Sequence, residues 1–330
     1  MNNSLPSVSV IIPCYNASRF VTRAIASVFH QSVRVAQLIC VDDGSEDNTL
    51  DVLNNLAAGA PIPLKILTIE HGGSAAARNL GLEYATGQFV QFLDADDELL
   101  PLKLELQLSA IADSASRVDL VAGAFLWVHR YRLASFRCPT FLDSWANLIS
   151  GNLGVTSANL WRRSSVMNAA AWNPKQTSSQ EYELMFRMMQ NNTGLLLSHQ
   201  PLTRKFDEPG SMTSGTGKPN ERRKNNLLNY VYLRRSIARY LETNDMMDDR
   251  RRELFFNTVH ARLKQLFPYD PEQAINIHKK TIPEDHCLPG HDGPGVPAMR
   301  DLLCAPASYP SITGEGITPP DEYCLPHTHQ

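Results

Sequence analysis

The sequence predicts an α/β fold with a doubly wound, mostly parallel sheet flanked by helices, followed by a helical C-terminal region and an irregular tail. Up to about residue 206, short apolar segments alternate with stretches of helical periodicity, which favours parallel strands joined by helices. Residues 219–280 have helical character and are rich in Arg and Lys. Residues 283–330 hold nine of the 21 prolines and show no sustained periodicity, which is typical of an irregular tail.

Apolar runs identify the strands, and turn residues separate them from the helices. We expect strands at residues 8–12, 38–41, 64–69, 89–93, 119–124, 158–162, 195–198 and 202–206. We expect helices capped by Ser18 and by Asp47 or Ser45, over 74–85, after Pro101, near Trp145, over 180–190 and within 219–280. The helix after Ser18 places Val21, Ala24, Ile25 and Val28 at the i, i+3, i+4 and i+7 spacing of one buried face.

The composition excludes several classes of protein. The formal net charge of -3 argues against a nucleic-acid partner. A transmembrane helix needs about 18 consecutive apolar residues, and a signal peptide needs basic and apolar regions; we expect neither here. Six cysteines without a CxxC pair favour a reduced, cytoplasmic setting. A basic helical region from Arg222 to Arg252, which includes Arg234, fits either a solvated helix face or peripheral contact with the inner face of a membrane.

An acidic cluster follows the expected strand 89–93. Asp94, Asp96 and Asp97 come directly after it. Like charges so close together repel one another unless a cation or hydrogen-bond donors offset them. A helix cap before Pro101 is the alternative interpretation.

Three other strand ends carry polar turns, at residues 13–16, 42–45 and 71–73. Ligands of doubly wound sheets bind outside the carboxyl ends of the strands. The four turns are therefore expected to converge on one edge of the sheet. The turn at 13–16 lacks the glycines of a dinucleotide-binding loop, and no P-loop is present. Phosphates at this acidic edge would require a divalent cation, Mg²⁺ or Mn²⁺.

Five segments in order resemble a family-2 glycosyltransferase of the GT-A fold. They are 7–16 (SVSVIIPCYN), 41–49 (VDDGSEDNT), 73–87 (GSAAARNLGLEYATG), 92–98 (FLDADDE) and 179–187 (SQEYELMFR). Together they span residues 7–187. The resemblance implies an inverting enzyme that uses a nucleotide sugar.

The resemblance also implies a nucleotide-sugar site. Pro13, Tyr15 and Asn16 would line the nucleotide pocket, with Tyr15 near the base. Asp43 would accept a hydrogen bond from the imide N–H of the base, which fits uracil or thymine best. Arg78 would face the nucleotide sugar or its diphosphate.

The sequence Asp94-Ala95-Asp96 matches the DxD motif of the family. The resemblance places Asp94 and Ala95 at the nucleotide sugar, and Asp96 together with Asp94 at the metal. Glu181 matches the general base of the family. A carboxylate can take the proton of an attacking sugar hydroxyl, and direct displacement inverts the anomeric carbon.

Two positions depart from the family pattern. The family often has Glu-Asp where this chain has Gln180-Glu181, so the reach of the base differs by one methylene. Many relatives carry a histidine after the last short strands, whereas residues 204–208 lack one. No site is predicted there.

The sequence therefore predicts a glycosyltransferase that moves a sugar from a nucleotide donor, expected to be UDP-linked, to a saccharide or lipid-linked saccharide in polysaccharide assembly. A sugar nucleotidyltransferase and a non-catalytic nucleotide-sugar-binding protein are the alternatives. The expected domains are a catalytic domain over residues 1–215, a helical region over 216–282 and a tail over 283–330.

Overall fold

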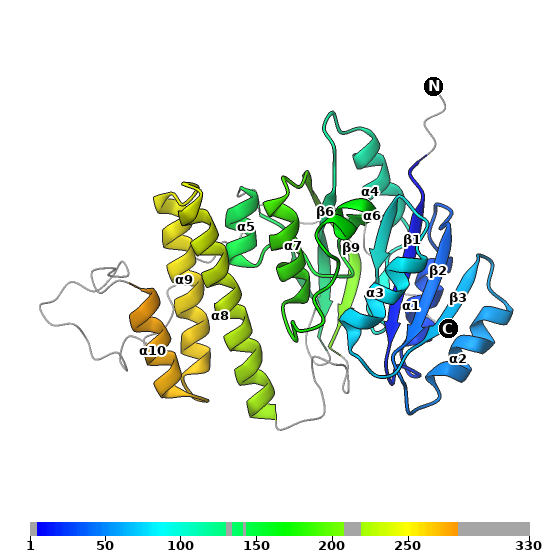
Figure 1. Ribbon diagram of the computed structural model, residues 1–330. Coiled ribbons are helices and arrows are strands. Elements are labelled where there is room, and N and C mark those ends of the chain that lie inside the picture. The colour runs from blue at the N-terminus through cyan, green and yellow to red at the C-terminus, as the bar shows by residue number, and fades with distance from the viewer. Residues whose placement is uncertain (1–4, 130–133, 141–142, 208–218, 283–330) are drawn as a thin grey trace, which may run out of the picture.

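The computed structural model describes residues 5–129, 134–140, 143–207 and 219–282 (Figure 1). The predicted tail, residues 283–330, lies outside these ranges. The elements are, in chain order, β1 Val8–Cys14, α1 Val21–Phe29, β2 Gln37–Asp42, α2 Thr49–Ala58, β3 Leu64–Thr68, α3 Ser74–Tyr84, β4 Phe89–Phe92, β5 Glu98–Leu99, α4 Lys103–Ala112, β6 Leu120–Val128, β7 Ser135–Arg137, α5 Ser144–Ser150, β8 Leu160–Arg162, α6 Arg163–Asn168, α7 Gln180–Gln190, β9 Leu195–Phe206, α8 Pro219–Thr243, α9 Asp249–Leu266 and α10 Pro271–Thr281.

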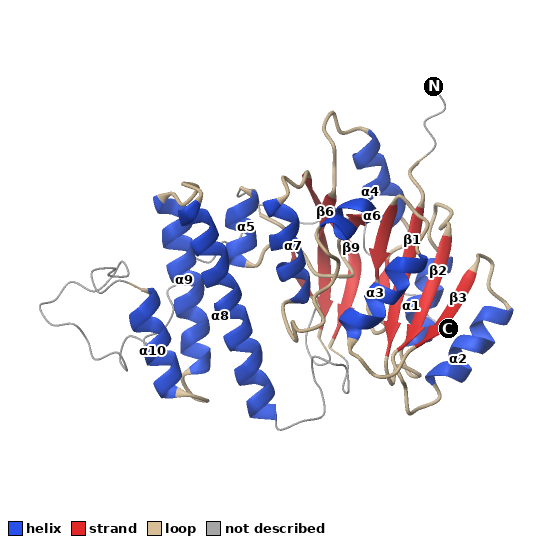
Figure 2. Cartoon of the chain, in the orientation of Figure 1, coloured by secondary structure: helices blue, strands red, loops and turns tan. Residues whose placement is uncertain are grey.

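One sheet forms the centre of the N-terminal part (Figure 2). Its strand order is β3-β2-β1-β4-β8-β6-β9-β5, and β7 pairs with β6. Strands β3, β2, β1 and β4 are parallel. Strand β8 is antiparallel to both β4 and β6, and β6 is parallel to β9. The carboxyl ends of β1, β2, β4, β6 and β9 therefore share one edge. The predicted α/β fold is confirmed, and the antiparallel pairings among the described strands begin at β8.

Two apolar cores lie on opposite faces of the sheet. Helices α1 and α4 pack on one face, where the predicted stripe on α1 is fully buried. Helices α3, α5 and α7 pack on the other face, and this second core continues into α8, α9 and α10. The predicted helical region over 219–280 is thus three helices that share a core with the sheet.

Small residues bring α3 close to the sheet. Ala75, Ala77 and Gly81 are all buried, and Ala77 and Gly81, four residues apart, lie on the same face of α3. A Cβ added at Gly81 would lie 2.5 Å from Cγ2 of Ile11, so any larger residue would push the helix away. The glycine fixes how closely α3, and with it Arg78, approaches the edge of the sheet.

Three local predictions are wrong. Helix α1 begins at Val21 with no capping side chain, because the hydroxyl of Ser18 donates to Asp47 instead (2.7 Å). Strand β1 continues through Pro13, which pairs with Val41. The two short strands expected between 195 and 206 form the single strand β9, which has register irregularities in its middle.

The C-terminal helices lie beside α5 and α7, on the side of the molecule away from β3 (Figure 1). Arg234 of α8 was expected on a basic face but is completely buried. Its guanidinium carbon lies 3.7 Å from the ring centre of Tyr230 and 4.9 Å from that of Tyr182, and its Nε donates to the carbonyl of Ile149 (3.2 Å). Among the helices of the described ranges, none has both the length and the apolarity needed to cross a membrane.

Candidate functional site

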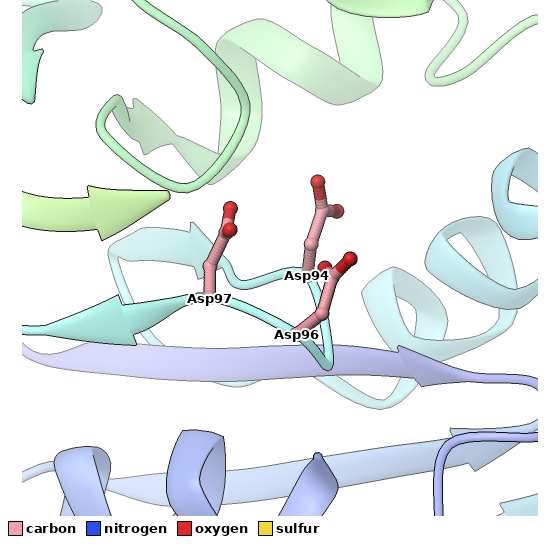
Figure 3. Close-up of side chains that lie close together, drawn as sticks. All are labelled: Asp94, Asp96 and Asp97. Carbon is pink, nitrogen blue, oxygen red and sulfur yellow. The ribbon is translucent and has the colours of Figure 1, made fainter. Parts of the chain in front are cut away.

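The acidic cluster forms a tight turn at the carboxyl end of β4. The N–H of Asp97 donates to the carbonyl of Asp94 (3.0 Å), and this turn gathers the three carboxylates. One oxygen from each of Asp94, Asp96 and Asp97 lies within 4.8 Å of the others. Figure 3 shows the side chains of Asp94 and Asp96 next to each other, with Asp97 at the end of the turn that enters β5. The turn thus presents its charges as one cluster rather than as a helix cap.

Asp97 is the innermost of the three, and its side chain is completely buried. It accepts hydrogen bonds from the hydroxyl of Ser157 (2.6 Å) and the N–H of Phe206 (3.3 Å). The ammonium of Lys205 lies 3.9 Å from Oδ2 of Asp97, the oxygen that also accepts from Ser157. Burial, with smaller contributions from Asp94 and Asp96, raises the pKa of Asp97 to about 7 in spite of that ammonium.

Asp94 and Asp96 differ in their partners. Burial would raise the pKa of Asp94, but Arg78 and Lys205 hold it below the ordinary value. Burial and the charge of Asp94 raise the pKa of Asp96. Cations therefore outweigh the effect of burial on the pKa of Asp94, whereas Lys205 and Arg23 offset burial and repulsion only in part at Asp96.

Arg78 links the acidic cluster to helix α7. One guanidinium nitrogen donates to Asp94 (2.7 Å) and another to the side-chain oxygen of Gln180 (2.8 Å). The guanidinium also lies over the ring of Trp172, 4.6 Å from its centre. Because Arg78 is buried and held on several sides, it fixes the start of α7 relative to the cluster.

Glu181 lies in the first turn of α7, directly after Gln180. Burial raises the pKa of its carboxyl group. The charge of Asp94 also raises this pKa, whereas the charges of Arg78 and Lys205 lower it. The structure therefore brings Glu181 into the same electrostatic environment as the acidic cluster. A carboxylate with a raised pKa is a better proton acceptor near neutral pH.

A second group of predicted residues surrounds the loop after β3. The ring of Tyr15 stacks on His71 with centres 4.1 Å apart. Asp43 is buried and accepts hydrogen bonds from the N–H groups of Gly72 (2.8 Å) and Gly73 (2.9 Å). Nδ1 of His71 also lies 3.1 Å from a carboxylate oxygen of Asp43. The Asp43 carboxylate thus holds this loop, and its oxygens keep further lone pairs for a ligand.

The remaining predicted residues flank these two groups. Asn16 has a left-handed backbone (φ 48°), and its side-chain oxygen accepts from the N–H of Glu46 (2.8 Å). Pro13 lies in β1, next to β2, and Ala95 lies in the acidic turn. The edge of the sheet therefore brings together the predicted residues of four separate turns.

Lys205 and Ser157 were not predicted. Lys205 lies near the end of β9, where residues alternate between the two faces of the sheet. A charged pair at the end of an apolar strand, Arg204-Lys205, was the available signal. Ser157 carries no signal in the sequence, because its role depends on the approach of two distant segments.

The donor set fits a divalent cation. Mg²⁺ and Mn²⁺ prefer carboxylate oxygens, and the cluster offers three carboxylates within 4.8 Å. Lys205 and Arg23 offset the repulsion between Asp94 and Asp96 only in part, and a bound cation would offset the remainder.

Comparisons of the sequence agree with the resemblance. Residues 9–143 match the family model described as "Glycosyl transferase family 2". An uncharacterized glycosyltransferase of Haemophilus influenzae is 40% identical over 106 residues, which cover 32% of this chain and 42% of that protein. A UDP-Glc:alpha-D-GlcNAc-diphosphoundecaprenol beta-1,3-glucosyltransferase of Escherichia coli is 41% identical over 103 residues, which cover 31% of this chain and 40% of that protein. The chain thus spans less than half the length of these two relatives.

Solved structures share the fold. TarS of S. aureus in complex with UDP-GlcNAc matches with a TM-score of 0.54 at 19% identity, covering 82% of this chain and 83% of that chain. The mannosyltransferase PcManGT of Pyrobaculum calidifontis, in complex with GDP-Man and Mn2+, matches with a TM-score of 0.53 at 17% identity, covering 83% of this chain and 79% of that chain.

Proposed function

We propose that this chain, which carries a glycosyl transferase family 2 domain of the GT-A fold, transfers a sugar from a nucleotide-diphosphate donor to a saccharide or lipid-linked saccharide, with inversion of the anomeric carbon. One observation carries the proposal. Arg78 connects Asp94 of the acidic cluster to Gln180, and Glu181 follows in the same helix. Groups suited to holding a diphosphate and to accepting a proton are thereby fixed relative to each other.

The donor would lie along the edge of the sheet. Pro13, Tyr15 and Asn16 line the nucleotide pocket in this proposal, and the stacked pair of Tyr15 and His71 offers an aromatic surface to the base. Asp43 accepts the imide N–H of uracil with a lone pair that Gly72 and Gly73 leave available. The preference for a UDP-linked donor rests on this contact.

The sugar and diphosphate would reach the acidic turn. Asp94 and Ala95 contact the nucleotide sugar in this proposal, and Arg78 faces the diphosphate. Asp96 and Asp94 would hold Mg²⁺ or Mn²⁺. When bound, the cation would offset the charge that develops on the leaving nucleoside diphosphate. Lys205 brings a protein cation to the same cluster.

Glu181 would act as the general base. Its carboxylate takes the proton of the attacking hydroxyl while the bond from the anomeric carbon to the diphosphate breaks. The hydroxyl attacks from the side opposite the diphosphate, so an α-linked donor gives a β-linked product. The raised pKa of Glu181 supports this role.

The acceptor is proposed from the relatives. The E. coli relative is named for a diphosphoundecaprenol-linked acceptor, which supports a lipid-linked saccharide for this chain. The exposed Arg223, Arg239, Arg250 and Arg252 of α8 and α9 would then meet anionic lipid at the cytoplasmic face of the membrane. Of the described part of the chain, residues up to 207 would perform the transfer and the helices of 219–282 would face the acceptor, within the predicted divisions 1–215 and 216–282.

The rival enzyme is a sugar nucleotidyltransferase. That reaction requires a glycine-rich first loop with a basic residue, whereas the first loop here is Pro13-Cys14-Tyr15-Asn16. A non-catalytic binding protein would have no use for Glu181 close to the acidic cluster.

Thermal unfolding with a panel of nucleotide sugars, with and without Mn²⁺, tests the proposal. We expect UDP-linked sugars to raise the unfolding temperature, and Mn²⁺ to increase the effect. If no nucleotide sugar stabilises the protein in either condition, the donor site does not exist. Release of UDP from the stabilising donor then tests for transfer, because a binding protein would release none.

A further inference from the structure

Two aromatic rings lie together at the carboxyl end of β6, outside the site described above. The rings of Trp127 and His129 are stacked with centres 5.4 Å apart and an interplanar angle of 25°. Both residues are half-buried rather than covered. The guanidinium carbon of Arg137 on β7 lies 5.9 Å from the centre of the Trp127 ring.

Asp207, directly after β9, holds both rings in place. One carboxylate oxygen accepts the indole N–H of Trp127 (2.6 Å), and the other lies 2.8 Å from Nδ1 of His129. Nε2 of His129 in turn lies 3.0 Å from the hydroxyl of Ser135. Exposed ion pairs contribute little to stability, and the side chain of Asp207 is 45% exposed. The arrangement is therefore better explained as orientation of the rings than as stabilisation of the fold.

The strand register places these rings beside the acidic cluster. Trp127 pairs with Lys205 across the parallel strands β6 and β9, so their side chains lie on the same face of the sheet. Lys205 reaches the carboxylate of Asp97 from that face, and Asp207 is two residues further along. The backbones of Trp127 and Lys205 are thus about one strand spacing, roughly 5 Å, apart, and Lys205 borders the proposed donor site.

We propose that the stacked rings of Trp127 and His129 form a platform, with an outer ring face on which a pyranose ring of the acceptor saccharide stacks. The inference rests on the proposed glycosyltransferase function and names the acceptor side of that site. One face of a pyranose carries C–H groups and is apolar, so it packs on the flat indole. Arg137 and the exposed edge of Asp207 offer a donor and an acceptor to the hydroxyl groups at the edge of the sugar.

The platform is rigid before the sugar arrives. Fixing the rings through Asp207 removes the entropy that free side chains would lose on binding. A need for fixed rings would also explain why the Asp207 carboxylate binds two half-exposed rings rather than water.

Binding of methyl glycosides of glucose, galactose and N-acetylglucosamine, measured by ligand-observed NMR in the presence of UDP, tests the platform. We expect at least one glycoside to bind the wild type and to bind Trp127→Ala about tenfold more weakly. Trp127→Phe retains a flat ring but loses the N–H that Asp207 accepts, so its affinity should lie between those of the wild type and Trp127→Ala. The matched control is Phe136→Ala, because Phe136 is 54% exposed on β7 but alternation places it on the other face of the sheet.

Three outcomes overturn the platform: no glycoside binds the wild type, Trp127→Ala binds as well as the wild type, or Phe136→Ala loses as much affinity as Trp127→Ala. Thermal unfolding checks that each variant is folded. The rise in unfolding temperature produced by UDP-linked sugars distinguishes the donor-site proposal from the platform proposal. This rise should be the same in Trp127→Ala and the wild type. If that rise is present while the glycoside results fail, the donor function stands and the platform falls.

Discussion

The ammonium of Lys205 lies 3.9 Å from the carboxylate of Asp97, and strand β9 holds both in place, because the N–H of its last residue, Phe206, donates to the same carboxylate. Asp97 strongly raises the pKa of Lys205, and Asp94, Asp96 and Glu181 add to the effect. The lysine therefore remains charged among four carboxyl groups.

Replacing Lys205 by Met should raise the affinity for the metal and lower the turnover. Removal of the protein cation makes the electrostatic potential at the carboxylates more negative, so Mn²⁺ should bind more tightly. Sugar transfer should fall by about a hundredfold, because a fixed charge near the leaving diphosphate is lost. Mn²⁺ titrations followed by electron paramagnetic resonance, together with UDP-release assays, measure the two effects. Lys205→Arg is the control and should keep most activity; weaker Mn²⁺ binding in Lys205→Met would contradict the account.

Glu181→Gln should still bind the donor but should lose sugar transfer. The amide is nearly the same size but cannot accept the proton of the hydroxyl, so transfer should fall at least about a hundredfold. The unfolding-temperature shift with the donor should remain as in the wild type. Glu183→Gln, two residues along the same helix, is a matched control. Unchanged turnover in Glu181→Gln would remove this residue as the base.

The same carboxyl group should set the acid limb of the pH profile. Burial places the pKa of Glu181 above its ordinary value of 4.5, and only the ionised form can act as a base. Turnover should therefore fall as the pH drops through a value higher than 4.5. Turnover at saturating donor and acceptor over a pH series measures this limb. A limb below the ordinary value would conflict with the burial of Glu181.

Asp96→Asn should lose the response to metal without loss of stability in metal-free buffer. The change removes one of three clustered negative charges, so repulsion decreases while a cation ligand is lost. Thermal unfolding with EDTA and with Mn²⁺ tests both statements. The protein should unfold at the same or a higher temperature in EDTA and show a smaller Mn²⁺ shift. A full Mn²⁺ shift would show that Asp96 is not a ligand.

Gly81→Ala should destabilise the fold and displace Arg78. The new methyl would lie 2.5 Å from the stiff, β-branched side chain of Ile11, which should cost about 1–3 kcal/mol of unfolding free energy. Urea denaturation measures the loss. Gly59→Ala is the control, because no atom lies within 4 Å of its added Cβ. Equal stability of the two variants would mean that α3 can move away from β1 without cost.

Asp119 should stabilise the fold in a pH-dependent way. Burial would raise its pKa, but hydrogen bonds from Ser165, the N–H of Gly194 and Arg117 lower it below 3.8. The stabilisation is present above 3.8, the ordinary value, and is lost as the pH falls through the lower value of the folded state. Asp119→Asn should cost about 1–3 kcal/mol at neutral pH. Urea denaturation should show this difference shrinking in acid; a constant difference would contradict it.

The sequence predicted those features that depend on local pattern. The apolar stripe of α1 and the acidic turn after β4 were predictable, because periodicity and a shift from apolar to acidic residues are visible along the chain. The environment of Lys103 could not be predicted in this way. It lies at the start of α4, where a lysine usually faces water, yet it is fully buried and its ammonium donates to the side chains of Gln91 and Gln107 (2.7 Å to the latter).

The partners of the acidic cluster could not be predicted from the sequence either, because they come from distant segments of the chain. Ser157 and Lys205 reach Asp97 from segments 60 and 108 residues away (157 − 97 and 205 − 97). The pairing of β9 with β6 and β5 fixes the approach of Lys205, and the pairing of β8 with β4 and β6 fixes that of Ser157, which lies just before β8.

Arg234 has a consequence for building chimeric enzymes. It lies against Tyr182, the neighbour of Glu181, and against Tyr230 on its own helix α8, and it binds the carbonyl of Ile149 in α5. In a chimera joined between β9 and α8, Arg234 would come from one parent and Tyr182 and Ile149 from the other. The buried guanidinium would then pack against side chains of a different protein. A chimera should therefore keep Arg234 and Tyr230 of α8 together with Ile149 of α5 and Tyr182 of α7, so that the buried guanidinium retains its own partners.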